Sequence, residues 1–160
     1  ACVLGQEMAG YATGETFFAG QSLGFRHSHL DTGAYSYDQK NGGQDVAAAV
    51  RFLVDDEAAR VVLTSMVACL FARSVYTDTV LAECLDVLGY GSLAANMASL
   101  GPRVQKLRWQ TRLATGFAPA AVTIPKRFFQ VSTWKGPIDS AYLDQLKEAY
   151  AQAILDLGSP

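Results

Sequence analysis

The sequence predicts an all-α protein, a multihelical orthogonal bundle with a glycine-rich N-terminal segment that contains loops. Apolar residues recur at helical spacing in several stretches after residue 44, and cap-type residues such as Thr77 and Asp139 stand before two of these stretches. No stretch shows the strong alternation of apolar and polar residues that marks a half-buried strand. We therefore divide the chain into a glycine-rich segment, residues 1–43, and a helical C-terminal domain, residues 44–160.

The glycine-rich segment is also dense in aromatic residues. Glycine recurs too often there for long uninterrupted helices, so we expect loops with one short helix near residues 16–23. The aromatic side chains need apolar partners, and contiguous exposed apolar patches usually mark interfaces. We expect this segment either to be the most mobile part of the chain or to pack against a second copy in a homodimer.

Residues 45–60 are rich in alanine and place apolar side chains on one helical face, which predicts a helix. The apolar run Leu63–Tyr76 follows, and it is too short for the ~20 residues that a membrane-spanning helix needs. We expect it to contribute to a second, buried helix over about residues 58–71. Cys69 would lie inside this helix, where a free cysteine usually acts as a small hydrophobe.

Two further helices have clear start and stop signals. Thr77 is a suitable N-cap for a helix that ends near Gly89, and Cys84 falls on the apolar face of that helix as core filling. Asp139 is a suitable N-cap for a long C-terminal helix that stops at Gly158. These residues predict the boundaries of both helices.

Between them, Ser92 is a candidate cap for another helix, and we expect a break at Gly101 because proline follows it. A new helix is expected over residues 102–114, with Val104, Leu107, Trp109 and Leu113 on its apolar face and a solvated basic face made of Arg103, Lys106, Arg108 and Arg112. Residues 115–136 contain prolines, glycines and aromatic residues, which predicts an ordered loop.

The composition argues against several classes of function. With 13 basic and 15 acidic residues among 160, the formal charge of −2 gives no reason to expect binding to nucleic acid or to an anionic membrane. The cysteines Cys2, Cys69 and Cys84 lack close spacing, which argues against a disulfide framework or a self-contained zinc site and favours a reducing cytoplasm. No secretory signal opens the chain, and the absence of an initial methionine leads us to expect part of a longer or processed protein.

Four segments follow the pattern of one enzyme family. They are Leu4–Tyr11 (LGQEMAGY), Arg26–Asp31 (RHSHLD) together with Gly33, Tyr35, Asp38 and Gln39, Thr64–Thr77 (TSMVACLFARSVYT), and Pro125–Phe129 (PKRFF). Together they resemble the C-terminal region of the tungsten-containing aldehyde:ferredoxin oxidoreductase family, over about residues 3–157. Each motif is weakly specific by itself, and the combination carries the resemblance.

The resemblance implies a role for Cys69. In that family a cysteine at this position is the last ligand of an iron-sulfur cluster beside a tungstopterin, and the other ligands come from an upstream Cys-x-x-Cys-x-x-x-Cys motif that this sequence lacks. Thr64 stands where the family has an acidic residue that contacts the pterin, and Val67 stands where it has glycine. The implied site is therefore Cys69 as metal ligand and Thr64 as cofactor contact.

The implied enzyme oxidises aldehydes to carboxylates at tungsten or molybdenum and passes electrons through an iron-sulfur cluster to ferredoxin. Residues 1–43 would continue from an absent upstream domain, and the isolated chain would be inactive and hold no tungstopterin or cluster. The alternative is a non-catalytic helical assembly or interaction module that has kept the family fold, with Cys69 inert. Thr64 in place of the acidic residue favours this alternative.

His27 and His29 alternate with Asp31 along the chain. In an extended segment the three side chains would share one face, as a metal site requires, whereas ordinary loop histidines need no such geometry. The resemblance implies a catalytic role for one of His27 and His29, because family members keep a histidine near the tungsten. Imidazole, with an unperturbed pKa of ~6.5, suits hydrogen bonding to a substrate oxygen or proton transfer there. Glu7 is a further functional candidate, with a structural role as its alternative.

Overall fold

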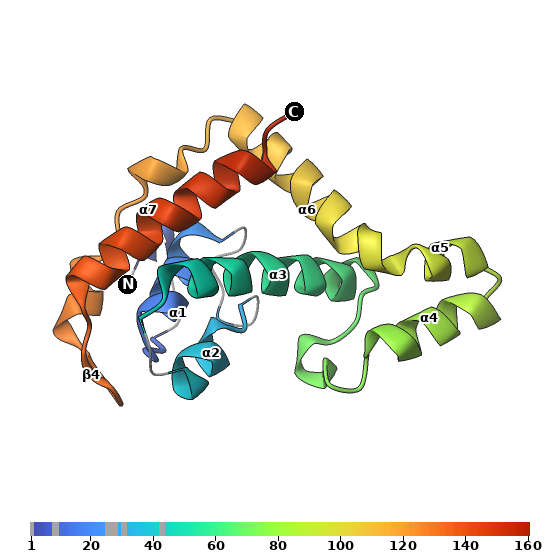
Figure 1. Ribbon diagram of the computed structural model, residues 1–160, viewed down its shortest axis with the longest axis horizontal. Coiled ribbons are helices and arrows are strands. Elements are labelled where there is room, and N and C mark those ends of the chain that lie inside the picture. The colour runs from blue at the N-terminus through green and yellow to red at the C-terminus, as the bar shows by residue number, and fades with distance from the viewer. Residues whose placement is uncertain (1, 8–9, 25–28, 30–31, 42–43) are drawn as a thin grey trace.

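The computed structural model describes residues 2–7, 10–24, 29, 32–41 and 44–160 (Figure 1). The described residues are mostly helical, so the predicted mainly α class is confirmed. The α-helices are α1 (Glu15–Leu23), α2 (Ala34–Lys40), α3 (Val46–Ser65), α4 (Asp78–Val87), α5 (Gly91–Ala95), α6 (Met97–Ala114) and α7 (Ser140–Leu157). The 3₁₀ turns are η1 (Leu70–Ala72), η2 (Pro119–Ala121) and η3 (Lys126–Gln130). The strands form two antiparallel hairpins, β1 (Cys2–Val3) with β2 (Gln6–Glu7) and β3 (Ser132–Thr133) with β4 (Gly136–Pro137).

The main core lies where α1, α3, α6 and α7 meet. In Figure 1, α3 crosses the middle of the molecule, α6 and α7 cover one side of it, and α4 and α5 project away from this body. The largest fully buried side chains of this core include Phe17, Phe18, Trp109, Leu143 and Ile154. Burial of each such side chain stabilises the fold by about 1.5–3 kcal/mol. These contacts unite α1 with the C-terminal helices in one core.

The short helix predicted near residues 16–23 is confirmed as α1, and all of its residues are buried. Its packing is within the chain, against α7, α2 and α3. For α1, the expected burial against another copy is therefore wrong, whereas the expected mobility of residues 1–43 stays a prediction. The helix α2 was not expected from the sequence, because it is a short and mostly polar segment whose Tyr35 and Tyr37 pack against the core.

A smaller apolar cluster joins α4 to the C-terminal part of α3 and the start of α6. It consists of Val62, Leu63, Leu81, Leu85 and Met97. The predicted stop of α4 is confirmed, because the chain continues through Gly89 with φ of 86°, in the left-handed region that favours glycine.

The predicted N-caps at Thr77 and Asp139 are both confirmed. Thr77 Oγ1 accepts a hydrogen bond from the Val80 N–H at 3.4 Å, and Asp139 Oδ1 accepts one from the Tyr142 N–H at 3.0 Å. Each of these bonds satisfies a backbone donor that the first helical turn leaves without a partner.

Three helix predictions after residue 57 are wrong. The expected second helix over residues 58–71 does not exist as a separate element, because α3 runs without a break from Val46 to Ser65 and then ends. Cys84 is exposed rather than in the core. The side of α4 that packs on its neighbours is the stripe with Leu81 and Leu85, and Cys84 lies beside this stripe. Ser92 does not cap a helix, since α5 already begins at Gly91.

The break expected at Gly101 is also absent, because α6 continues through Pro102. Both Pro102 and Ala98 are exposed, so water can reach the Ala98 carbonyl that loses its helical donor. Gly101 serves packing instead, since a Cβ at this position would lie 2.5 Å from the Ala58 carbonyl oxygen of α3. The glycine thus lets the two helices approach closely.

The predicted faces of α6 are only partly correct. Trp109 is fully buried as expected, but Leu107 is 63 % exposed. Among the basic residues, Arg103 and Lys106 are exposed, whereas the guanidinium of Arg112 lies 4.0 Å from the Phe117 ring centroid and 5.4 Å from that of Trp109. Burial lowers the pKa of the Arg112 guanidinium.

The loop over residues 115–136 is ordered, as predicted, and contains η2, η3 and β3. Its anchor is Phe128, whose ring stacks on that of Phe18 at 4.2 Å with an interplanar angle of 5°. Among the helices that the structure describes, none has both the length and the apolar character required to cross a membrane.

Candidate functional site

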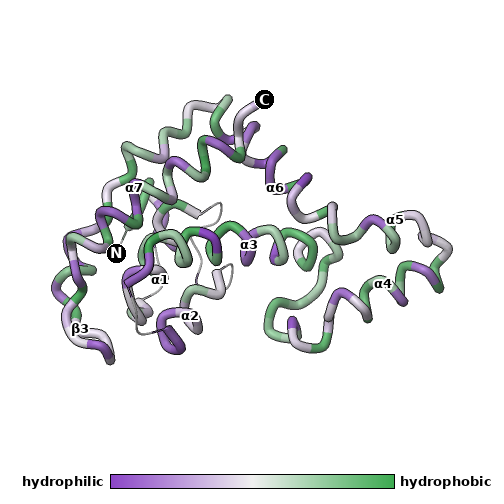
Figure 2. Tube along the Cα trace, viewed as in Figure 1, coloured by the Kyte–Doolittle hydropathy of each residue, from purple (hydrophilic) through white to green (hydrophobic). Residues whose placement is uncertain are grey.

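Cys69 lies on the surface, at the residue before η1. Both predictions of its burial, as part of a buried helix and as a small core hydrophobe, are wrong. Its neighbours Val67, Phe71 and Val75 are 91 %, 77 % and 62 % exposed. Figure 2 shows the apolar character of the chain continuing from α3 into this loop. The most apolar run of the sequence therefore surrounds an exposed thiol.

The local cause is the way in which α3 ends. The Ala68 N–H donates to the Leu63 carbonyl at 2.9 Å, and the Val67 N–H donates to the Thr64 carbonyl at 3.2 Å. These two bonds define a Schellman motif, which requires a left-handed residue, and Val67 supplies it with φ of 57°. The chain consequently turns away from the axis of α3 before Cys69, so the apolar run cannot continue as a helix.

Thr64 lies in the last turn of α3 and is partly buried. Its hydroxyl donates to the carbonyls of Arg60 and Val61, at 3.0 and 3.1 Å as alternatives. It lines a cavity of about 20 Å³ together with Asp56, Arg60 and Tyr150, which is room for about one water molecule. The contact of Thr64 with a pterin stays a prediction.

His29 is described by the structure, whereas His27 and Asp31 lie outside the described residues, so the shared face of the three side chains is untested. The His29 ring packs on that of Tyr11, with centroids 4.4 Å apart. Tyr11 in turn meets Tyr35 edge to face at 5.9 Å. The histidine thus belongs to a row of aromatic rings.

A cleft of about 250 Å³ brings this row of rings together with the turn that follows Cys69. Its lining includes Tyr11, His29 and Tyr35 from the N-terminal segment, Arg60 from α3, and Phe71 and Arg73 from the η1 region. We call this site the η1 cleft. It places one predicted catalytic residue, His29, beside the segment that carries the predicted metal ligand.

The charged groups of the η1 cleft differ in their partners. Arg60 is mostly buried and its Nε donates to Asp56 Oδ2 at 2.7 Å, in an ion pair that also receives the Gly33 N–H. Arg73 is exposed, and its Nη1 donates to the Leu70 carbonyl at 2.8 Å. The cleft therefore combines a charge-balanced pair with a guanidinium whose partner is a carbonyl.

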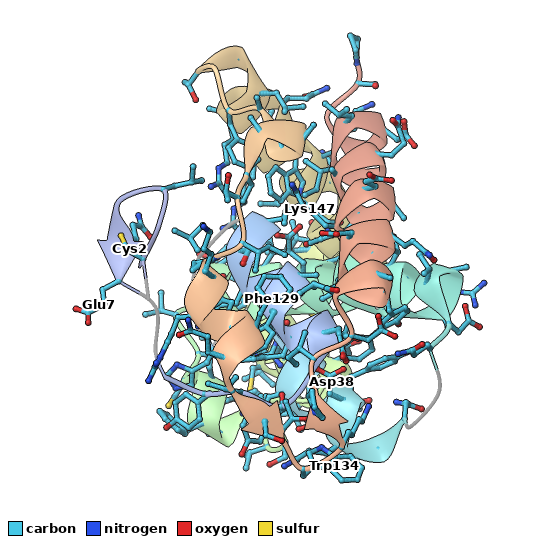
Figure 3. All side chains as sticks on the ribbon, turned by 90° about the vertical axis from the view of Figure 1, so that its left-hand side faces the viewer. Cys2, Glu7, Asp38, Phe129, Trp134 and Lys147 are labelled. Carbon is cyan, nitrogen blue, oxygen red and sulfur yellow. The ribbon has the colours of Figure 1, made fainter. Side chains whose placement is uncertain are left out.

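Sequence reasoning did not identify Tyr11, Tyr35, Arg60, Phe71 and Arg73 as site residues. The resemblance already contained four of these five residues, because Tyr11, Tyr35, Phe71 and Arg73 stand in the segments that resemble the family. Nothing in the sequence placed these segments side by side. Glu7, the other candidate, is exposed in the β1–β2 hairpin and points away from the helices (Figure 3).

The metal-binding capacity of the described part of the chain is limited. No three of its His, Cys, Asp or Glu side chains are grouped to hold a metal ion. The thiol of Cys69 is free and exposed, which is what a single ligand to a cluster held mainly by other cysteines requires. The arrangement fits one contributed ligand and does not fit a complete site.

A second cavity, of about 200 Å³, lies among Glu15, Asp38, Lys135, Asp139 and Tyr142. Two of its carboxylates accept hydrogen bonds from backbone N–H groups. Asp38 Oδ2 accepts from the Phe17 N–H at 2.8 Å, and Glu15 Oε1 accepts from the Asp139 N–H at 2.8 Å. Burial raises the pKa of Asp38, and it raises the pKa of Tyr142 to about 12. These acidic groups are therefore structural, and Asp38 is labelled in the lower part of Figure 3, between Phe129 and Trp134.

Comparisons of the chain with protein-family models, with curated proteins and with solved structures give no match.

Proposed function

We propose that the chain is the C-terminal helical part of an oxidoreductase similar to the tungsten-containing aldehyde:ferredoxin oxidoreductases. The observation that carries the proposal is that exposed Cys69 precedes the same turn whose Phe71 and Arg73 line a cleft with His29. A cluster ligand must be accessible to a partner domain, and a substrate-handling histidine must face a cavity. Cys69 meets the first requirement and His29 meets the second.

In this proposal the chain supplies three things to the complete enzyme. Cys69 provides one thiolate ligand, and the upstream domain provides the remaining ligands and most of the contacts to the tungstopterin. When bound, the metal centre would supply the two-electron oxidation of an aldehyde and water to a carboxylate and three protons, with both electrons leaving through the cluster to ferredoxin. His29 can hold or transfer a proton at the substrate oxygen, and the helices hold both residues in place. A reducing cytoplasm suits a chain whose described cysteines are free.

The test is co-expression of the chain with the upstream half of the enzyme, followed by measurement of tungsten, molybdenum and iron. We expect a stable complex that contains tungsten or molybdenum and an iron-sulfur cluster, and loss or weakening of the cluster with Cys69→Ser. The matched control is Cys84→Ser, which removes another exposed thiol and should leave the iron content unchanged. Equal iron content and equal ferredoxin reduction in Cys69→Ser and the wild type would refute the role of Cys69.

A second candidate function is a non-catalytic assembly module. The specific observation in its favour is the exposure of three apolar residues within one short stretch of chain, Val67, Phe71 and Val75, because exposed apolar surface, where it is contiguous, usually marks an interface. In that case the co-expressed chain would bind its partner without changing the metal content. Phe71→Ser would then weaken the complex, and Cys69→Ser would leave both the binding to the partner and the metal content of the complex unchanged.

A further inference from the structure

The volume of the η1 cleft limits the size of a ligand. The cleft is open to solvent on one side and has a volume of about 250 Å³. An apolar cavity of about 150 Å³ is enough to bind benzene. The η1 cleft therefore has room for one six-membered ring and a small substituent. A nucleotide or a fused polycyclic ligand would extend out of it.

The lining of the cleft favours a planar ring. Tyr11, His29 and Tyr35 form a continuous row, and Tyr35 meets the core residue Phe17 edge to face at 6.0 Å. Because Phe17 is fully buried, the row is fixed to the main core. Aromatic side chains favour another aromatic ring over an aliphatic group of equal area, through stacked or edge-to-face contacts. Phe71, which is largely exposed, adds a further ring from the η1 side.

The charge of the cleft favours an anion. Among the described lining residues there is no aspartate or glutamate, and the charged groups are Arg60 and Arg73. The charge of Arg60 is balanced by Asp56. Arg73 donates to the Leu70 carbonyl through Nη1, and a guanidinium carries five donors in a planar fork that matches a carboxylate. His29, which also lines the cleft, can add a hydrogen bond to such a group but no negative charge.

We infer that the η1 cleft binds a single-ring aromatic carboxylate, with the ring against Tyr11, Tyr35 and Phe71 and the carboxylate on Arg73. Among the described lining residues, Arg60 is paired with Asp56, which lies outside the lining, and Arg73 donates to a backbone carbonyl. A monoanion therefore matches the single charge of Arg73, whereas a phosphate dianion would call for further cations. The substrate class that follows, aromatic aldehydes oxidised to these carboxylates, rests on the function proposed above. The binding itself needs no metal centre.

The binding test uses the 160-residue chain and benzoate as the probe. Titration followed by amide chemical shifts should show millimolar binding, with shifts centred on Tyr11, Tyr35, Phe71 and Arg73. Cyclohexanecarboxylate keeps the charge without the aromatic ring, and benzamide keeps the ring without the charge. Both should bind at least about fivefold more weakly than benzoate, because each lacks one of the two contacts. Equal binding of benzoate and benzamide would overturn the assignment of the carboxylate to Arg73.

Two variants test the residues directly. Arg73→Gln should weaken benzoate binding about tenfold, because it removes a charge-assisted contact. Arg103→Gln is the matched control, since Arg103 is exposed on α6 and does not line the cleft, and it should bind benzoate like the wild type. Phe71→Ala should reduce the preference for benzoate over cyclohexanecarboxylate. Equal weakening by Arg73→Gln and Arg103→Gln would show nonspecific charge attraction and overturn the proposal.

The outcomes of this test are separate from those of the metal test. If benzoate binds as described but the co-expressed complex holds no metal, the aromatic carboxylate site stands and the oxidoreductase proposal fails. If the complex assembles its metal centre but benzoate does not shift the cleft residues at tens of millimolar, the site proposed here fails and the oxidoreductase proposal stands.

Discussion

Replacing Val67 with glycine should stabilise the protein, although it removes an apolar side chain. Val67 occupies the left-handed position of the Schellman motif at the end of α3, with φ of 57°. L-residues pay a steric penalty there, which is most severe for β-branched side chains. Glycine has no Cβ and adopts this conformation without the penalty. The change is therefore expected to relieve strain while preserving the two capping hydrogen bonds.

The magnitude follows from three effects. Relief of the left-handed conformation contributes about 1–2 kcal/mol. The greater freedom of glycine in the unfolded chain removes about 0.5–1 kcal/mol of this gain. Lost burial contributes almost nothing, because Val67 is 91 % exposed. The net stabilisation is about 0.5–1 kcal/mol, which corresponds to a rise in Tm of about 1–4 °C for a chain of this size.

Urea denaturation and thermal unfolding of the two proteins measure this difference. The matched control is Val87→Gly, because Val87 is 87 % exposed but belongs to α4, where the backbone is helical. That change should destabilise by up to about 1 kcal/mol, since glycine weakens a helix. A destabilised Val67→Gly, or equal effects of both substitutions, would refute the explanation of how α3 ends.

Three further predictions concern buried polar groups and thiols. Glu57→Ala should destabilise by about 1–3 kcal/mol in urea denaturation, because Glu57 Oε2 accepts from the buried Trp109 Nε1 at 2.7 Å; an unchanged midpoint would contradict this role. The raised pKa of Asp38 means that the folded state takes up its proton at a higher pH than the unfolded state. The wild type should therefore gain stability relative to Asp38→Asn as the pH falls from neutral toward the ordinary carboxyl pKa, and a pH-independent difference would count against the burial of this charge. Cys69 and Cys84 should both react with a thiol reagent in the native protein nearly as fast as in urea, and strong protection of either would contradict its exposure.

Sequence patterns predicted the elements whose signals act within one helical turn. The caps at Thr77 and Asp139 and the stop at Gly89 depend on hydrogen bonds and backbone angles of neighbouring residues, so the sequence contains them directly. The Schellman motif that follows α3 was not predicted. Its left-handed position is usually glycine, which can be recognised in a sequence, but here it is occupied by Val67.

The candidate site could be predicted only in parts. His29 and Cys69 were identified through the resemblance, but their relation to Arg73 and Tyr11 depends on how α2, α3 and η1 pack. No sequence spacing links residue 11 to residue 73. The exposure of Cys69 could not be predicted from its apolar neighbours in the sequence either. Hydropathy is a property of each residue type, whereas the burial of a side chain depends on which other parts of the chain pack against it.

The sequence by itself determined that the chain is mainly helical and where two of its helices begin, because propensity and capping are local properties. The tertiary structure alone decided which face of α4 is buried, how Arg112 lies against Trp109 and Phe117, and which side chains line the η1 cleft. Each of these depends on contacts between segments far apart in the chain. A helix can carry several apolar stripes along its surface. The stripe that becomes buried is the one against which other segments of the chain pack.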